Sequence, residues 1–144
     1  MSEINIIKNE EKYSVCSIGK LEDLGKFTYK HPLLTEDMKG KVFVGEALNT
    51  TSMEISFQSL PAGQEIPFDH KHRKHEEVYV TLKGKGRFFV DDEVMEISEG
   101  TMVRIAPEAR RRWSNPYDQE LLVMVIQAVN NTLKQHTVFD GYVD

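Results

Sequence analysis

The sequence predicts an all-β domain, a sandwich or barrel of short strands, and three observations support this fold class. Short apolar segments from residue 41 onward are separated by turn signals such as Pro61-Ala62-Gly63, Gly84-Lys85-Gly86 and Asn115-Pro116. Within Val78–Leu82, apolar residues recur at every second position, as on a half-buried strand. The length of 144 residues is typical of one domain with one core, and no repeat or linker divides it.

Two elements are predicted before residue 41. Lys12–Ile18 is predicted to be a strand. Leu21–Phe27 is predicted to be a short N-terminal helix, because Leu21, Leu24 and Phe27 recur at helical spacing.

The segment Leu121–Ile126 contains no polar residue, which favours a strand that is buried on both faces. The predicted strands from residue 41 onward are Val42–Ala47, Met53–Ser59, Val78–Leu82, Arg87–Val90, Glu93–Ile97, Met102–Ile105 and Leu121–Ala128. Residues 130–144 are predicted to be a polar tail that packs across the barrel or a partner subunit.

Composition and charge exclude several classes of protein. The formal net charge is −5 and Arg110–Arg112 is the only basic cluster, so the sequence argues against nucleic-acid binding. Cys16 is the single cysteine, which excludes an intrachain disulfide and favours a reducing, cytoplasmic location. No signal peptide and no apolar segment long enough to span a bilayer is present, so no membrane partner is expected.

The segment Phe68–Val80, FDHKHRKHEEVYV, is the candidate functional site. His70 and His72 are two residues apart and project to the same face of an extended chain. A turn at Arg73–Glu76 would bring Glu77 back toward this pair. Two imidazoles and one carboxylate suit a divalent transition metal, Fe, Mn, Ni, Co or Zn, and leave coordination positions open. The alternative is a charged, solvated turn without a ligand.

The site and its surroundings resemble the cupin family. The first cupin motif is matched by Gly63, His70, His72, Glu77 and Gly84, with a spacer after Gly63 that is one residue longer than usual. The resemblance implies a double-stranded β-helix, the jelly-roll barrel, in a single cupin domain over 1–144. The barrel would cover about 47–129, between an N-terminal extension, 1–40, and the tail. It also implies a homodimer and a small-molecule ligand.

The second cupin motif departs from the family pattern. Aligned on Asn115, Arg111 occupies the position of the histidine that commonly supplies a fourth metal ligand; aligned on Pro107, Arg112 does. An arginine cannot ligate a metal. Three alternatives follow: a metal held by three residues alone, an arginine that binds the acidic group of a substrate, or no metal, with the arginine paired to Glu77.

Three functions are compatible with the resemblance. The first is a metal-dependent dioxygenase, isomerase or lyase that acts on a small acidic molecule, with Arg111 or Arg112 orienting the substrate. Tyr79 would be the acid–base group, because it shares a strand face with Glu77. The second is a non-catalytic metal-binding or sensing protein. The third is a metal-free sugar isomerase or epimerase with His70 or His72 as the base.

Several further side chains are candidates to line a cavity. Thr81 shares the strand face of Glu77, and Arg104 would need a carboxylate partner if it were buried. The others are Phe57, Phe68, Phe89, Met102 and Trp113.

Overall fold

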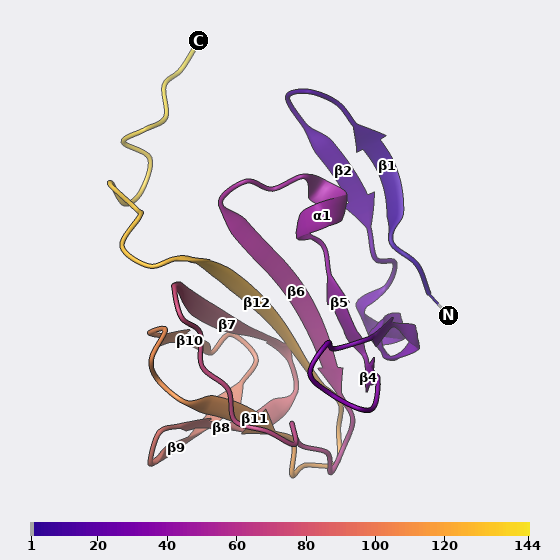
Figure 1. The fold of residues 1–144 in the computed structure, drawn as a ribbon. Helices are drawn as coiled ribbons and strands as arrows, with labels where there is room; N and C mark the ends of the chain where they lie inside the picture. Colours follow the sequence, from indigo (N-terminus) through magenta and orange to yellow (C-terminus); the bar gives the residue numbers. More distant parts are fainter. Residues whose placement is uncertain (1) are drawn as a thin grey trace.

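The computed structural model describes residues 2–144 and consists mostly of β-strands with two short helices (Figure 1). It confirms the predicted fold class. The larger sheet is antiparallel and has the order β10-β7-β12-β6-β5. Its strands are β5 (Lys41–Phe43), β6 (Met53–Leu60), β7 (His75–Lys83), β10 (Met102–Ile105) and β12 (Leu121–Val129).

A smaller antiparallel sheet faces the larger one and has the order β11-β8-β9. Its strands are β8 (Lys85–Val90), β9 (Glu93–Ser98) and β11 (Arg111–Ser114). Strands from different parts of the chain thus lie side by side in both sheets, and the barrel interior lies between them. Strand β11 was not predicted, because Arg111 and Arg112 directly follow Arg110 and this basic run hides any alternation between apolar and polar residues.

The larger sheet is covered on both faces, which explains the continuous apolar sequence of β12. Leu121, Val123 and Val125 pack into the barrel core with Phe88. Leu122 points the other way, into a second cluster formed with the N-terminal segment. The prediction of a strand buried on both faces is therefore confirmed.

The N-terminal segment forms that second cover. A hairpin of β1 (Asn5–Asn9) and β2 (Ser14–Ser17) precedes a 3-10 helix, η1 (Leu21–Lys26). Leu24 and Phe27 are buried and pack against the sheet. Figure 1 shows the hairpin projecting beyond the sheet and the C-terminal tail leading away from the barrel. A small pair, β3 (Thr28–Tyr29) and β4 (Met38–Lys39), completes the fold.

The prediction of a strand over Val42–Ala47 is wrong after its first residues. Strand β5 ends at Phe43, and Gly45–Leu48 forms the single-turn helix α1. The Glu54 carboxylate accepts the Gly45 N–H at 2.8 Å and so holds the chain in the turn. A long-range contact of this kind cannot be seen in the local sequence.

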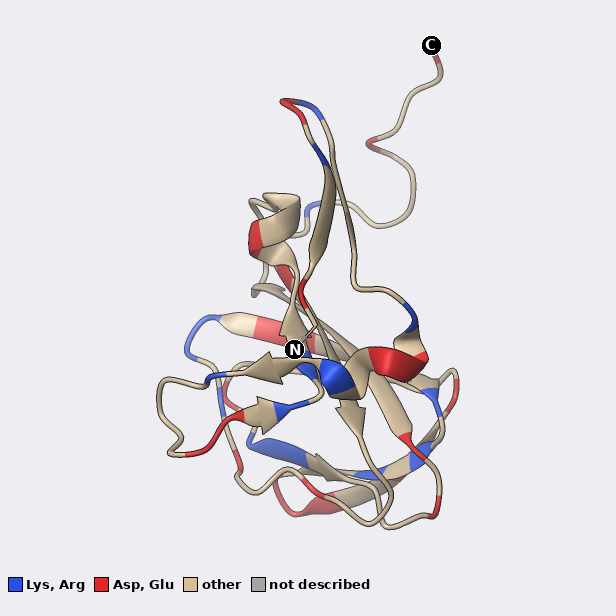
Figure 2. Ribbon diagram, turned by 90° about the vertical axis from the view of Figure 1, so that its right-hand side faces the viewer, with Lys and Arg blue, Asp and Glu red and all other residues tan. Residues whose placement is uncertain are grey.

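Acidic and basic residues are mixed over the ribbon (Figure 2). None of the helices within residues 2–144 combines the length and the apolar character that a bilayer crossing requires.

Candidate functional site

The backbone before β7 positions the two histidines beside β11. His70 and Arg111 form an antiparallel bridge in which each backbone N–H donates to the other's carbonyl at 3.1 Å. Residues directly opposite in such a pair project to the same side. The His72 N–H donates to the Pro107 carbonyl at 2.9 Å, which fixes the second histidine next to the first.

Strand β7 supplies the acidic residue from the opposite sheet. Glu77, Tyr79 and Thr81 alternate with more exposed neighbours and all three are buried. The predicted turn was two residues too long, since β7 already begins at His75. Glu77 nevertheless faces the histidine pair as expected, because strand alternation sets its direction.

Three candidate ligand atoms therefore converge inside the barrel. The ligand atoms of His70, His72 and Glu77 all lie within 4.8 Å of one another. The Glu77 Oε1 atom is 3.6 Å from His70 Nε2 and 3.3 Å from His72 Nε2. Ligands at about 2.0–2.2 Å from a shared metal are themselves about 2.8–3.6 Å apart. Both spacings between the carboxylate and the imidazoles lie in this range, as expected for ligands of one divalent metal.

Arg111 occupies the side of the site where a fourth ligand would be expected from the resemblance. Its side chain is fully buried, and its Nη2 and Nε donate to Glu77 Oε1 at 2.7 and 3.0 Å. Its Nη1 donates to the carbonyls of Pro107 and Ala109 at 3.2 and 2.7 Å. Most of the guanidinium donors are thus already used within the protein. A metal bound at Glu77 would lie close to this cation, which is unfavourable without an added anion.

Arg112 points away from the site. It lies over the Phe89 ring, 4.0 Å from the centroid, and pairs with Glu65 and Asp69, each at 3.2 Å. The two arginines diverge because adjacent residues of a strand face opposite sides. Arg111 is therefore the residue at the ligand position, and the alignment on Asn115 describes the structure.

Charge and burial have opposite effects on the Glu77 carboxyl. Burial alone would raise its pKa, but the His70 and His72 imidazoles and the Tyr79 hydroxyl outweigh burial and hold the pKa far below its usual range. The Arg111 ion pair at 2.7 Å acts in the same direction. Glu77 is therefore ionised at physiological pH, which is the state that binds a metal.

Tyr79 is tied to the same carboxylate. Its hydroxyl donates to Glu77 Oε1 at 2.7 Å. Burial, together with the Glu77 charge, raises the pKa of Tyr79 well above its usual value. The phenol therefore stays protonated and acts as a hydrogen-bond donor that orients Glu77.

A cavity of about 450 Å³ opens beside these residues. His70, His72, Glu77 and Tyr79 line one part of it. The part contributed by β5 and β6 was not predicted, and its polar lining residues are Lys41, Ser56 and Gln58. Arg111 and Arg112 are not among the lining residues that the structure gives within 2–144.

The other predicted cavity residues divide into two groups. Phe68 and Trp113 line the cavity. The remaining five lie elsewhere. Thr81 is buried on β7 without lining the cavity, Phe57 packs in the N-terminal cluster, and the Phe89 ring contacts Arg112. Met102 is exposed, and Arg104 pairs with Glu76 at the surface.

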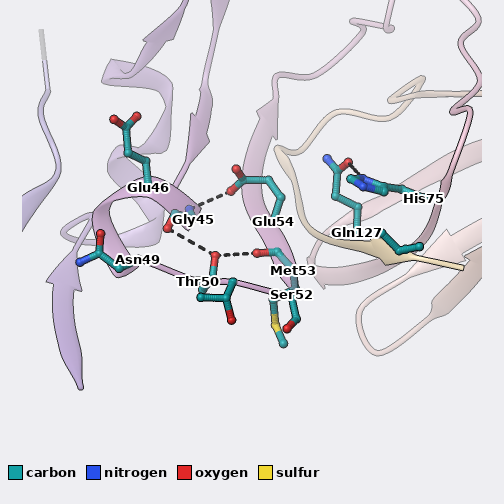
Figure 3. Close-up of a pocket in the computed structure, with 11 residues that line it drawn as sticks. Gly45, Glu46, Asn49, Thr50, Ser52, Met53, Glu54, His75 and Gln127 are labelled. Carbon is teal, nitrogen blue, oxygen red and sulfur yellow. Dashed lines mark hydrogen bonds between the residues drawn. The ribbon is translucent and has the colours of Figure 1, made fainter. Parts of the chain in front are cut away.

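A second hollow, of about 620 Å³, lies beside α1 and holds His75 (Figure 3). Two of its polar side chains already have partners: Glu54 accepts the Gly45 N–H, and Thr50 donates to the Met53 carbonyl at 2.6 Å. His75 Nδ1 lies 2.8 Å from Gln127 Oε1 and is outside the cluster of candidate ligands. These contacts fix the local backbone, and the barrel cavity remains the better candidate for a ligand site.

Comparisons with known proteins agree with this architecture. The Cupin_2 family, a cupin domain, matches residues 56–127, half of the chain. A cupin protein from Bacteroides fragilis is 34% identical, with a TM-score of 0.69 over 81% of this chain and 97% of that chain. No curated protein matches.

More distant structures show the fold alone. A predicted oxalate decarboxylase from Thermotoga maritima is 19% identical, with a TM-score of 0.57 over 65% of this chain and 82% of that chain. An uncharacterized double-stranded β-helix protein from Klebsiella pneumoniae is 16% identical, with a TM-score of 0.58 over 79% of this chain and 90% of that chain. The family match, the related structure from B. fragilis and the jelly-roll architecture lead to one conclusion: this chain belongs to the cupin family.

Proposed function

We propose that this cupin binds a divalent transition metal through His70, His72 and Glu77 and holds a small acidic organic molecule in the cavity beside it. The two spacings from Glu77 Oε1 to the histidines support this proposal, since 3.3 and 3.6 Å lie within the range expected between ligands of one ion. Two imidazoles and one carboxylate suit Fe(II), Mn(II), Ni(II) or Zn(II). The bound metal supplies a Lewis acid with open coordination positions.

The surrounding residues prepare the site for this role. Arg111 and Tyr79 hold the Glu77 carboxylate in one orientation and keep it ionised. Trp113 and Phe68 give the cavity an apolar wall, which limits the access of water to the polar groups. The open cavity leaves room for an organic molecule next to the histidines.

A second candidate function needs no metal, and the ion pair between Arg111 and Glu77 favours it. Here the guanidinium replaces the charge of the ion, and the chain binds its ligand as a sensing protein or acts as an isomerase. His70 or His72 would then be the base.

Elemental mass spectrometry on protein purified without an affinity tag tests the first candidate. We expect close to one equivalent of metal in the wild type and its loss in the double variant His70→Ala, His72→Ala. His75→Ala is the matched control and should retain the metal, because this histidine lies outside the cluster. Absence of metal after reconstitution with Fe(II), Mn(II), Ni(II) and Zn(II) would contradict the proposal.

The variant Arg111→His separates the two candidates. It removes the buried cation and adds an imidazole at the position of the usual fourth ligand. We expect the affinity for Zn(II) to rise at least about tenfold, because a unit charge a few ångströms away is worth on the order of 1–4 kcal/mol. Zinc binding by this variant alone, with none by the wild type in titration calorimetry, would favour the metal-free candidate.

A further inference from the structure

Lys41 is directed into the barrel by the pairing of β5. It lies opposite Gln58 on β6, and the next residue, Val42, lies opposite Phe57. Val42 packs into the N-terminal cluster on the other face of the sheet. Since neighbouring side chains alternate, Lys41 must enter the cavity, where it is only 8% exposed.

The ammonium group of Lys41 is incompletely satisfied. It donates to Ser56 Oγ at 2.9 Å and lies 4.9 Å from the centroid of the Phe43 ring. Within residues 2–144, no carboxylate oxygen lies within 4.0 Å of it. An ammonium has three donors, and burying one without a countercharge costs several kcal/mol. A ligand that supplies the missing negative charge explains its position.

The balance of buried charge points to a monoanion. The buried ionised groups are two cations, Lys41 and Arg111, and one carboxylate, Glu77, which leaves one excess positive charge. Arg111 is already paired with Glu77 at 2.7 Å and does not line the cavity. Lys41 is therefore the buried cation available to a ligand. A metal at the histidines would add to this excess and require still more negative charge.

Three other groups of the cavity wall are also unpaired within residues 2–144. Gln58 Oε1, Trp113 Nε1 and His70 Nδ1 are buried without a hydrogen-bond partner, and all three residues line the cavity. His70 belongs to the candidate metal site, which leaves Gln58 and Trp113 for an organic ligand. The amide oxygen requires a donor, such as a hydroxyl group, and the indole N–H requires an acceptor. Buried groups of this kind normally have partners. A ligand with a carboxylate and a hydroxyl group would satisfy them together with Lys41.

We propose that Lys41 binds the carboxylate of a small hydroxy-monocarboxylate in the barrel cavity, with Gln58 and Trp113 contacting the rest of the molecule. This inference deepens the proposed function and depends on its ligand cavity, but it does not depend on the metal. In this proposal a residue of β5 binds the acidic group of the ligand. The sequence had predicted Arg111 or Arg112 for this role.

Trp113 is the only tryptophan in the chain, so its fluorescence reports on the cavity directly. We would titrate the protein with lactate, mandelate and gluconate, and with the matching amides, which lack the charge. The wild type should bind at least one carboxylate more tightly than its amide. Lys41→Met should reduce this preference about 10- to 100-fold, because a hydrogen bond to a charged group is lost. Lys39→Met removes an exposed lysine and should leave the preference unchanged.

A purely structural role of Lys41 predicts another result. Lys41→Met would then lower the melting temperature and leave the preference for the carboxylate intact. Ser56→Ala keeps the ammonium and removes its present partner, so this variant should keep the preference. A wild type that does not discriminate carboxylate from amide, or a Lys41→Met protein that still does, would overturn the inference.

Metal analysis of the same samples separates this inference from the proposed metal site. If protein that retains its metal shows no preference that depends on Lys41, only the present inference is contradicted. A Lys41-dependent preference in protein without metal supports the inference and excludes only the metal site.

Discussion

One carboxylate oxygen organises the site at the scale of single residues. Glu77 Oε1 accepts hydrogen bonds from Tyr79 and from two nitrogens of Arg111, and it faces both histidines. Substitution of Glu77 would therefore leave a buried guanidinium unpaired as well as remove a candidate ligand. Lys41 differs from Arg111 in this respect, since its ammonium has no carboxylate partner within residues 2–144.

Lys41 should make the stability of the protein depend on pH. Burial lowers the pKa of Lys41 to about 8, against the opposing effect of Glu77 and Glu54, whereas the ordinary value is 10.5. Between these values the unfolded chain binds a proton that the folded protein has lost, so stability rises with pH. Relative to Lys41→Met, the free energy of unfolding of the wild type should increase by about 3 kcal/mol across this window.

Urea unfolding of both proteins from about pH 7 to 10.5 measures this difference and cancels the titration of all shared groups. A constant difference across the range would show that the Lys41 ammonium is as well stabilised in the folded protein as in water.

Some residues of the site could be predicted from the sequence and others could not, for physical reasons. His70, His72 and Glu77 could be selected because a spacing motif and strand alternation limit where they point. The choice between Arg111 and Arg112 depended on the register of β11 against β8, which local sequence does not encode. Lys41 was missed because the predicted strand began one residue later, and a lysine at a strand end is usually solvated.

At the scale of elements, contacts with distant parts of the chain determined which strands and helices could be predicted from the sequence. The strand in Leu121–Ile126 was predictable because a sheet covered on both faces requires apolar residues throughout. Helix α1 was not predictable, since the Glu54 carboxylate that holds Gly45 comes from the following strand. The hairpin partner β1 was missed because its residues are all exposed and carry no alternation of burial.

The turn between β7 and β8 requires glycine at residue 84. Gly84 has φ of +83°, and a Cβ there would lie 2.2 Å from the Glu120 carbonyl oxygen. Gly84→Ala should therefore destabilise the fold more than Gly100→Ala, whose φ is +87° but whose surroundings are open. We expect a difference of at least about 1 kcal/mol in chemical denaturation. Equal losses in the two variants would show that the backbone angle alone determines the cost.

At the scale of the whole molecule, the apolar surface is unevenly distributed. The hairpin β1–β2 exposes Ile6, Ile7, Tyr13 and Val15, with 55%, 53%, 57% and 39% of each residue accessible. Apolar residues gathered on one projecting hairpin are typical of a contact surface. The homodimer implied by the family resemblance would use this surface.

Sedimentation velocity tests this expectation. The wild type should sediment as a dimer, and the double variant Ile6→Lys, Val15→Lys should sediment as a monomer, because lysines in an apolar contact must be desolvated. Val94→Lys is the control on β9, where the residue is 57% exposed and far from the hairpin in sequence. A wild type that stays monomeric at every concentration would contradict the prediction.

The guanidinium of Arg111 joins the interior of the barrel to its rim. One side of the group binds Glu77, and the other binds the carbonyls of Pro107 and Ala109 in the loop between β10 and β11. An ion or ligand that drew Glu77 away from Arg111 would leave the guanidinium attached only to this loop. One side chain thus connects the buried carboxylate of the cavity with the backbone of an outer loop, so a change at either end would be felt at the other without the movement of a domain.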